Sequence, residues 1–166
     1  MTLLTVLLCC LLPLQDGKKY ESKDYQFKLA FPGKPTLTSL DATSDVGKLT
    51  FHMTIWDGED KAVIVSKVDY PVDVKTFNAE QALDKGIVGA AKNAAGPAQD
   101  IKKTTFGPNK LPARTFVVEK VKDQIWGRNL LVMKGTRLYH VIVMGDKKYI
   151  HSKDADVIMA SFEITK

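Results

Sequence analysis

The sequence predicts an α+β domain whose strands form a mainly antiparallel sheet. Two pairs of strand-like segments are each joined by a tight-turn signal, at residues 57–60 and 134–136. Segments joined in this way form hairpins, and the two strands of a hairpin are antiparallel. Between the two pairs, over residues 76–97, the apolar residues change from strand spacing to helical spacing. We therefore expect one long helix packed against a sheet of hairpins.

The first strand is expected at residues 25–31, where every second residue is aromatic or leucine. Alternation with a period of two is typical of a half-buried strand. Pro32 ends this strand because it has no N–H to donate to a ladder, and Gly33 can adopt a positive φ. Neither residue has a reactive side chain, so the turn is interpreted as part of the architecture.

A hairpin is expected over residues 48–71. In its first strand, KLTFHMTIW, the leucine, phenylalanine, methionine and isoleucine occupy one face, and the threonines, histidine and tryptophan occupy the other. The segment DGED follows, and Asp-Gly is a favoured pair in hairpin turns. The returning strand, KAVIVSKVDYP, ends at Pro71.

The helix after this hairpin has recognisable start and stop signals. Asn78 with Gln81 three residues later resembles a capping box, and Gly96 followed by proline is a stop signal. Gly86 and Gly89 each cost about 1 kcal/mol relative to alanine inside a helix, so tertiary packing must hold it. We expect this small-residue face to let the helix lie close to the sheet.

The second half of the chain contains three further strands, ARTFVVEKV, IWGRNLLVM and RLYHVIVMG. The last two flank Lys134-Gly135-Thr136 and are predicted to form a hairpin. Residues 138–144 are apolar in both alternating sets apart from His140, which predicts a central strand covered on both faces. SKDADVIMASF is expected to be a short helix that begins at Ser152, and FEITK a last strand.

The N-terminal residues predict export. Residues 1–15 are rich in leucine and contain no charged side chain. This run is shorter than the roughly 20 residues that a spanning helix needs, but it matches the apolar region of a secretory signal peptide. We expect a signal peptide at 1–16, cleaved near Leu14 to Lys18, and a single domain at 17–166; a buried first helix is the alternative.

Both cysteines, Cys9 and Cys10, lie inside this segment. A processed chain would contain no cysteine, which excludes disulfides, thiolate metal ligands and a cysteine nucleophile. Lipoprotein anchoring would need a small residue before the modified cysteine, and Leu8 precedes Cys9. We therefore expect a secreted protein of the periplasm, cell envelope or exterior with no stable membrane span after processing, and lipid anchoring is the less favoured alternative.

The charge pattern argues against nucleic-acid binding. The formal net charge is +5, and the lysine pairs at 18–19, 102–103 and 147–148 are far apart in the sequence. Nucleic-acid binders gather basic residues on one face, with aromatic residues between them. Scattered lysines indicate solubility and weak attraction to anionic surfaces.

No catalytic, metal or cofactor motif is present in the sequence. The three histidines lack the spacing of a metal site, and there is no G-x-S-x-G elbow, phosphate-binding loop or twelve-residue calcium loop. We therefore expect no enzymatic activity, no metal and no cofactor. An enzyme whose site leaves no sequence signal stays a second alternative, because paired carboxylates need only be close in space.

Five residues are candidates for partner binding. They are aromatic or cationic, are expected to be exposed near one hairpin, and are Trp56, Trp126, Arg128, Arg137 and Tyr139. Tryptophan and arginine often anchor interfaces. The alternative is that they are ordinary sheet residues, covered by a helix layer or lying at an edge.

Taken together, several segments resemble a PsbP-like domain. They are DYQFKLAFPGKP, the hairpin LTFHMTIWDGEDKAVIVSKVDYP with the helix after it, NLLVMKGTRLYHVIVMG, and the closing ADVIMASFEIT. The resemblance covers nearly all of residues 20–165. It implies an antiparallel sheet with helices packed on both faces, in α/β/α layers, and a family whose members are mostly non-catalytic binding or assembly factors. Fold alone does not fix function.

These observations lead to one main expectation about function. We expect an exported, non-enzymatic module that binds another envelope or extracellular protein through its sheet edge or hairpin surface. The alternative is a carrier or sensor of a small apolar ligand held between the sheet and the helix.

Overall fold

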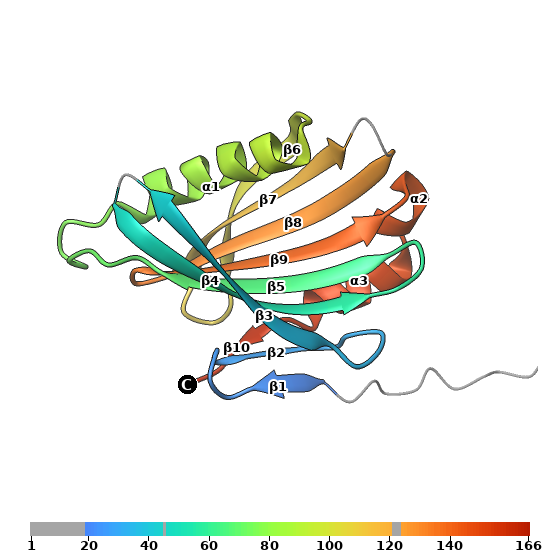
Figure 1. The fold of residues 1–166 in the computed structure, drawn as a ribbon, viewed down its shortest axis with the longest axis horizontal. Coiled ribbons are helices and arrows are strands. Elements are labelled where there is room, and N and C mark those ends of the chain that lie inside the picture. Colours follow the sequence, from blue (N-terminus) through green and yellow to red (C-terminus); the bar gives the residue numbers. More distant parts are fainter. Residues whose placement is uncertain (1–18, 45, 121–123) are drawn as a thin grey trace, which may run out of the picture.

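The computed structural model describes residues 19–44, 46–120 and 124–166. The predicted signal peptide at 1–16, with both cysteines, lies outside these residues. The chain forms a seven-stranded sheet in the order β3-β4-β5-β9-β8-β7-β6 and a three-stranded sheet in the order β1-β2-β10 (Figure 1). The strands are β1 (Tyr20–Ser22), β2 (Phe27–Leu29), β3 (Thr36–Ser44), β4 (Gly47–Asp57), β5 (Ala62–Asp69), β6 (Ala98–Phe106), β7 (Leu111–Lys120), β8 (Ile125–Lys134), β9 (Arg137–Gly145) and β10 (Glu163–Ile164).

Every strand pair is antiparallel, so the predicted α+β class and antiparallel sheet are confirmed. Both predicted hairpins are present. The turn between β4 and β5 closes with a bond of 2.8 Å from the Gly58 N–H to the Lys61 carbonyl. Gly135 has a φ of +63° in the turn between β8 and β9. The segment predicted to be central, β9, is the middle strand of the seven.

Three strands have no counterpart in the sequence prediction: β1, β3 and β6. β3 and β6 are the two edges of the large sheet, and nearly all of their residues are exposed or half-buried. An edge strand that buries neither face needs no alternation of apolar residues, so its sequence carries little periodic signal. This is why β3, which is mostly threonine, serine and alanine, was not predicted.

The first predicted strand is much shorter than expected. Only Phe27–Leu29, β2, has strand geometry within segment 25–31, because Gln26 adopts a left-handed φ of +57°. The turn at Pro32 and Gly33 lies against a tryptophan. A Cβ added to Gly33 would be 2.5 Å from Nε1 of Trp56, so no larger residue fits there without movement of the indole.

The long helix, α1 (Ala79–Ala94), begins and ends as predicted. Oδ1 of Asn78 accepts a bond of 3.0 Å from the Gln81 N–H. The chain turns away at Gly96, where an added Cβ would lie 1.7 Å from the carbonyl oxygen of Glu119 on β7. Two shorter helices, α2 (Lys147–Ile150) and α3 (Lys153–Ala160), follow β9, and α3 starts at the predicted cap, Ser152.

α1 packs on one face of the large sheet, here called the upper face (Figure 1). It lies over β7, with smaller contributions from β8 and β6. The buried residues between helix and sheet form the upper cluster: Leu49, Val68, Ala82, Leu83, Ile87, Phe116, Val118, Leu131, Met133 and Leu138. A Cβ added to Gly86 would lie 3.0 Å from Leu131, so the expected close approach of the small-residue face is confirmed there.

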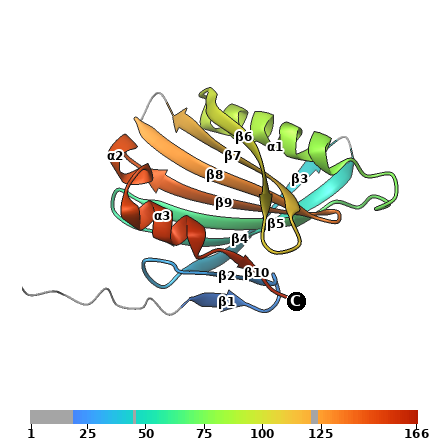
Figure 2. The ribbon, with the colours of Figure 1, turned by 180° about the vertical axis from the view of Figure 1, so that it is seen from behind.

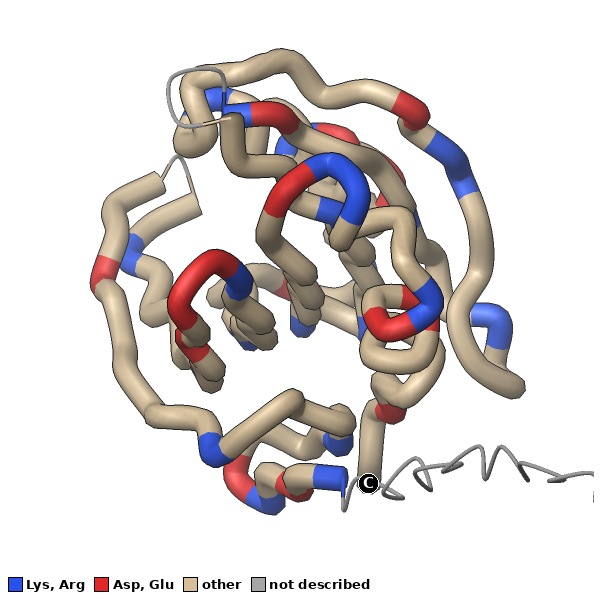
Figure 3. Tube along the Cα trace, turned by 90° about the vertical axis from the view of Figure 1, so that its right-hand side faces the viewer, with Lys and Arg blue, Asp and Glu red and all other residues tan. Residues whose placement is uncertain are grey.

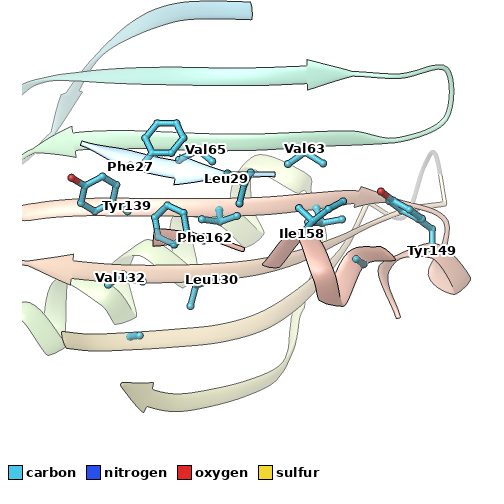
Figure 4. Close-up of a cluster of buried hydrophobic side chains, with 14 residues drawn as sticks. Phe27, Leu29, Val63, Val65, Leu130, Val132, Tyr139, Tyr149, Ile158 and Phe162 are labelled. Atoms are coloured by element: carbon cyan, nitrogen blue, oxygen red, sulfur yellow. The ribbon is translucent and has the colours of Figure 1, made fainter. Parts of the chain in front are cut away.

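The opposite, lower face carries a mixed cover (Figure 2). Side chains from the small sheet, α2 and α3 pack there into the lower cluster (Figure 4): Phe27, Leu29, Val63, Val65, Ala113, Leu130, Val132, Tyr139, Val141, Val143, Tyr149, Ala155, Ile158 and Phe162. Neighbouring residues of β8 separate the two clusters, since Leu130 belongs to the lower and Leu131 to the upper. Successive side chains of a strand point to opposite faces, so the large sheet lies between two buried cores.

Candidate functional site

Four of the five residues predicted to bind a partner lie on the hairpin of β8 and β9, and the fifth, Trp56, lies on β4. Trp126 pairs with Gly145 at one end of the β8–β9 ladder, and Arg137 pairs with Lys134 at the other end. Trp56 and Arg128 lie in one row across the sheet, but Val63 and Val143 lie between them. The five side chains are therefore spread along the sheet, although four of them belong to one hairpin.

The expectation of exposure is wrong for Tyr139. Its side chain is 0% exposed in the lower cluster, and its hydroxyl donates a hydrogen bond of 3.1 Å to the carbonyl of Tyr25. Burial raises the pKa of the Tyr139 phenol above its ordinary value. The residue stabilises the contact between the large sheet and the segment before β2.

Both arginines are held by groups of the protein itself. Arg128 Nη1 donates to Asp156 Oδ1 at 2.5 Å and to the carbonyl of Ile150 at 3.4 Å. Arg137 donates to Asp69, with 2.6 Å between Nε and Oδ1, and also to the side-chain oxygen of Gln26. Each arginine therefore links the large sheet to another segment, because Asp156 belongs to α3 and Gln26 precedes β2.

The two tryptophans are half-buried. Trp56 packs beside Gly33 and Gly58, where an added Cβ would come within 2.8 Å of the indole or closer. The Lys147 ammonium group lies over the ring of Trp126, 4.6 Å from the ring centroid, in a cation–π contact. Trp56 and Trp126 therefore both make contacts within the fold, and a role of these tryptophans in binding stays a prediction.

A different surface stands out on the upper face. Ile55, Ile64 and Ile142 are cross-strand partners on β4, β5 and β9, and Met53 and Met144 lie in the adjoining rows. All five are half-buried, and none of them packs against either core cluster. We call these five residues the apolar shelf.

The register places the shelf on the same side of the sheet as α1. Leu131 of the upper cluster pairs with His140, His140 pairs with Ser66, and Ser66 pairs with Met53. Cross-strand partners point to the same face. α1 lies over β6, β7 and β8, and the upper cluster also includes Leu49, Val68 and Leu138 on β4, β5 and β9. The shelf therefore occupies the other ends of β4, β5 and β9 on this face.

An apolar surface is unusual at this position. When one face of an antiparallel sheet is exposed to water, its side chains are normally polar. Large contiguous apolar patches on protein surfaces are typical of interaction sites. The sequence contained the signal in part, since residues 138–144 are apolar in both alternating sets, but that signal could not show which half of the face α1 leaves open.

His140 lies beside the shelf and contributes no positive charge to it. Its Nε2 donates to Oδ1 of Asn129 at 2.9 Å, and the Asn129 amide donates in turn to the Gly127 carbonyl at 2.8 Å. Desolvation by the neighbouring protein atoms lowers the pKa of the half-buried His140 from 6.5 to about 4. The ring is therefore neutral at pH 7 and adds no charge beside the shelf.

Two shallow cavities of the described chain lie away from the shelf. One of about 260 Å³ lies beside the turn between β6 and β7, lined by Phe106, Leu111, Phe162 and others. The other, of about 220 Å³, adjoins the start of α1 between Phe77 and Ala82. Both are smaller than the roughly 300–1,000 Å³ of typical small-molecule sites.

Three further observations concern the kinds of site that the described residues could form. Within 19–44, 46–120 and 124–166, no helix is long and apolar enough to cross a membrane. No group of three or more histidine, cysteine, aspartate or glutamate side chains in these same ranges could hold a metal ion. Basic and acidic residues are interspersed around the molecule (Figure 3).

Comparison with known proteins identifies the fold. No family model and no curated protein matches the sequence. Among solved structures, the chain is similar to the solution structure of cyanobacterial PsbP (CyanoP) from Synechocystis sp. PCC 6803, with a TM-score of 0.55. The match covers 89% of this chain and 91% of that chain at 10% sequence identity. This chain has a PsbP-like fold.

The resemblance suggested by the sequence is thus confirmed at the level of fold. PsbP-like architecture explains how the elements are arranged, but at such low identity it transfers neither a partner nor a site. The function of this PsbP-like chain must be argued from its own surface.

Proposed function

We propose that this protein is an exported, non-enzymatic binding module, and that its apolar shelf receives an amphipathic helix of another envelope or extracellular protein. The observation that carries the proposal is the shelf itself. Met53, Ile55, Ile64, Ile142 and Met144 are only half-buried, and none of them packs into the cluster that α1 covers on the same face. Burial of such a patch by a partner is favourable by about 25 cal/mol for each Å² removed from water.

The dimensions of the shelf favour a single helix as the occupant. The shelf spans three adjacent strands, β4, β5 and β9, and therefore two inter-strand spacings. Two spacings amount to about 10 Å, which matches the 10–12 Å diameter of a helix with its side chains. A partner helix on the shelf would lie beside α1 and complete the helical layer on this face.

The alternatives receive less support. A carrier of a small apolar ligand needs an enclosed space, and the cavities of about 260 and 220 Å³ are small and open. An enzyme needs reactive groups that converge on a substrate. The arginines Arg128, Arg137 and Arg114 are each bonded to carboxylates of the fold, and His140 is bonded to Asn129.

Export is the second part of the proposal, and it rests on the uncharged leucine-rich residues 1–15. N-terminal sequencing of the protein recovered from outside the cytoplasm tests it. We expect a first residue between 15 and 19. A chain that retains Met1, or that begins at a lipid-modified Cys9 or Cys10, would contradict it.

Site-specific crosslinking in the producing cell tests the binding surface. A photo-reactive amino acid at position 64 should form a covalent adduct with a partner, and the crosslinked peptide should have apolar residues at helical spacing. The same probe at Ile101, an exposed residue of β6, is the matched control. Ile142→Lys places a charge on the shelf and should abolish the adduct from position 64.

Two outcomes would overturn this proposal. One is an equal yield of adducts from positions 64 and 101. The other is an adduct from position 64 that Ile142→Lys leaves unchanged, since Ile142 is the cross-strand partner of Ile64.

A further inference from the structure

The β3 edge of the large sheet lacks the usual protection against further pairing. All nine residues of β3 pair in unbroken register with β4, and no other strand among the described residues pairs with its outer side. Asp41 is its single charged residue, and β3 contains neither lysine nor proline. Leu37 and Leu40 are each 57% exposed. A regular edge of this kind offers a row of backbone donors and acceptors to another strand.

The opposite edge, β6, shows the contrast within the same sheet. Its register shifts between Gln99 and Lys102, where Asp100 has a φ of +52°. Lys102 and Lys103 follow this irregularity. A bulge and adjacent lysines are two devices that prevent edge-to-edge association. The chain therefore blocks one edge and leaves the other open.

We propose that β3 pairs antiparallel with β3 of a second copy of this chain, about a twofold axis at Leu40. This inference concerns a surface other than the apolar shelf and does not depend on the helix proposed to bind there. The two copies would form one continuous sheet across the axis, with an isologous interface in which each copy uses the same residues.

The sequence of β3 is complementary to itself in this register. The pairs would be Leu40 with Leu40, Ser39 with Asp41, Thr38 with Ala42, Leu37 with Thr43, and Thr36 with Ser44. No pair joins two like charges. With the axis moved to Asp41, two carboxylates would face each other, which is destabilising. With the axis at Ser39, the two Leu40 side chains would no longer meet.

The charge of Asp41 is already balanced inside each copy. Its carboxylate accepts a bond of 2.8 Å from the Thr50 hydroxyl and lies 2.9 Å from the Lys48 ammonium group. The hydrogen bond from Lys48 is the main reason why the pKa of Asp41 lies below its ordinary value. The β3 edge therefore presents no unpaired charge to β3 of the second copy. Leu40 already lies beside Phe51, its cross-strand partner on β4, and would gain Leu40 of the second copy as a further apolar contact.

Dependence on salt separates a second copy from an extended segment of another protein. Two copies of a chain with a formal net charge of +5 repel one another at long range. Added salt screens this repulsion, so self-association should strengthen as the salt concentration rises. An acidic segment bound to the same edge would show the opposite dependence.

Sedimentation equilibrium of the purified protein, in the form that the cell produces, tests the proposal. We expect a reversible monomer–dimer equilibrium that salt strengthens. Leu40→Lys places two ammonium groups at the axis and should weaken the dimer by at least about tenfold, or about 1.4 kcal/mol. Ile101→Lys makes the same kind of change on the β6 edge and should leave the dimer unchanged, as should the shelf variant Ile142→Lys.

A charge-pairing experiment locates the axis. Leu40→Lys and Leu40→Asp should each be monomeric, and an equal mixture of them should form a heterodimer, because opposite charges then meet at the axis. Circular dichroism should show that both variants are folded, because Leu40 is an exposed position. A monomeric wild-type protein, a dimer that Leu40→Lys does not weaken, or a failure of the mixture to associate would each overturn the proposal. Loss of the dimer in Ile142→Lys alone would also contradict it.

Discussion

The two faces of the large sheet are covered in different ways. Both ends of the described chain contribute to the lower cover, since β1 and β2 begin it and α2, α3 and β10 complete it. The upper cover is the single helix α1, which lies over β6, β7 and β8. The lower face is therefore buried over most of its width, while the upper face keeps the apolar shelf on β4, β5 and β9.

Each cover is attached by an arginine from the sheet as well as by apolar packing. Arg128 joins the lower face to Asp156 of α3. On the upper face, Arg114 is 1% exposed and bonds to Glu80 and Asp84 on the first two turns of α1, at 2.5 and 2.9 Å. The comparison shows that this fold fixes its own covers with guanidinium–carboxylate pairs.

The largest expected effect concerns the lower cluster. Phe162→Ala should destabilise the protein by about 3–5 kcal/mol, because the lost ring leaves a cavity between the small sheet and β9. The ring lies 6.2 Å from that of Phe27, 5.3 Å from Phe106 and 6.0 Å from Tyr139. Urea unfolding followed by circular dichroism measures the loss.

Phe162→Leu is the matched control and should lose much less, since it keeps most of the buried volume. If Phe162→Ala costs less than about 1 kcal/mol, the lower cover is not a tightly packed core.

The second expected effect is a dependence of stability on pH that belongs to the upper face. His140 has a lowered pKa of about 4 against 6.5 for an unburied histidine. The unfolded chain therefore binds a proton at this group as the pH falls through 6.5, whereas the folded chain binds it only near pH 4. As the pH falls from about 6.5 to about 4, His140 should lower the free energy of unfolding by up to about 3 kcal/mol. Below about pH 4 the contribution of His140 should no longer change with pH.

His140→Gln keeps a donor for Asn129 but does not titrate. The difference in unfolding free energy between wild type and this variant, measured from pH 7 to pH 4, isolates the contribution of His140. A difference that does not change with pH would show that the imidazole is not desolvated.

The sequence predicted the inner part of the fold better than its edges. β4, β5, β8 and β9 were predicted because burial requires apolar residues at regular spacing. β3 and β6 were missed because an edge strand is held by backbone hydrogen bonds to a single neighbour, and these leave no pattern in the side chains. β2 was predicted too long because alternation cannot show the left-handed backbone of Gln26.

The binding surface was predicted less well, for a related physical reason. Trp126, Arg128 and Arg137 were chosen for their residue types, but their partners Lys147, Asp156 and Asp69 lie far away in the sequence. The alternation of residues in β9 does not show that Tyr139 is buried. The small sheet that buries Tyr139 could not be predicted from a local pattern. The shelf residues are isoleucine and methionine, which are common in protein cores, and only the position of α1 leaves them half-buried.

A smaller effect is expected from the anchor of the lower cover. Arg128→Gln removes the charged partner of Asp156 and weakens the bond to the Ile150 carbonyl, and it should cost about 1 kcal/mol. Amide hydrogen exchange should become faster in α2 and α3, because their attachment to β8 is weakened, while exchange in α1 should not change.

Lys48→Gln is the control for this prediction. It removes an ion pair with Asp41 in which both side chains are more than half exposed, so the cost should be near zero. Faster exchange in α1 of Arg128→Gln would contradict the view that the two covers are attached independently.

The smallest effect is expected on the shelf, and β5 offers a matched pair that compares the two faces directly. Ile64 belongs to the shelf, and its neighbour Val65 is 1% exposed in the lower cluster. Threonine is β-branched like both residues, so Ile64→Thr and Val65→Thr keep the strand propensity and change mainly the polarity of one face. Val65→Thr should cost about 1–3 kcal/mol because it buries a hydroxyl, whereas Ile64→Thr should cost about 0.5 kcal/mol or less. Urea unfolding of the isolated monomer measures both costs.

Equal costs for Ile64→Thr and Val65→Thr would show that the shelf is already part of the core. The expected difference would show that Ile64 contributes little to the stability of the monomer, which is the behaviour of a residue whose burial awaits a partner.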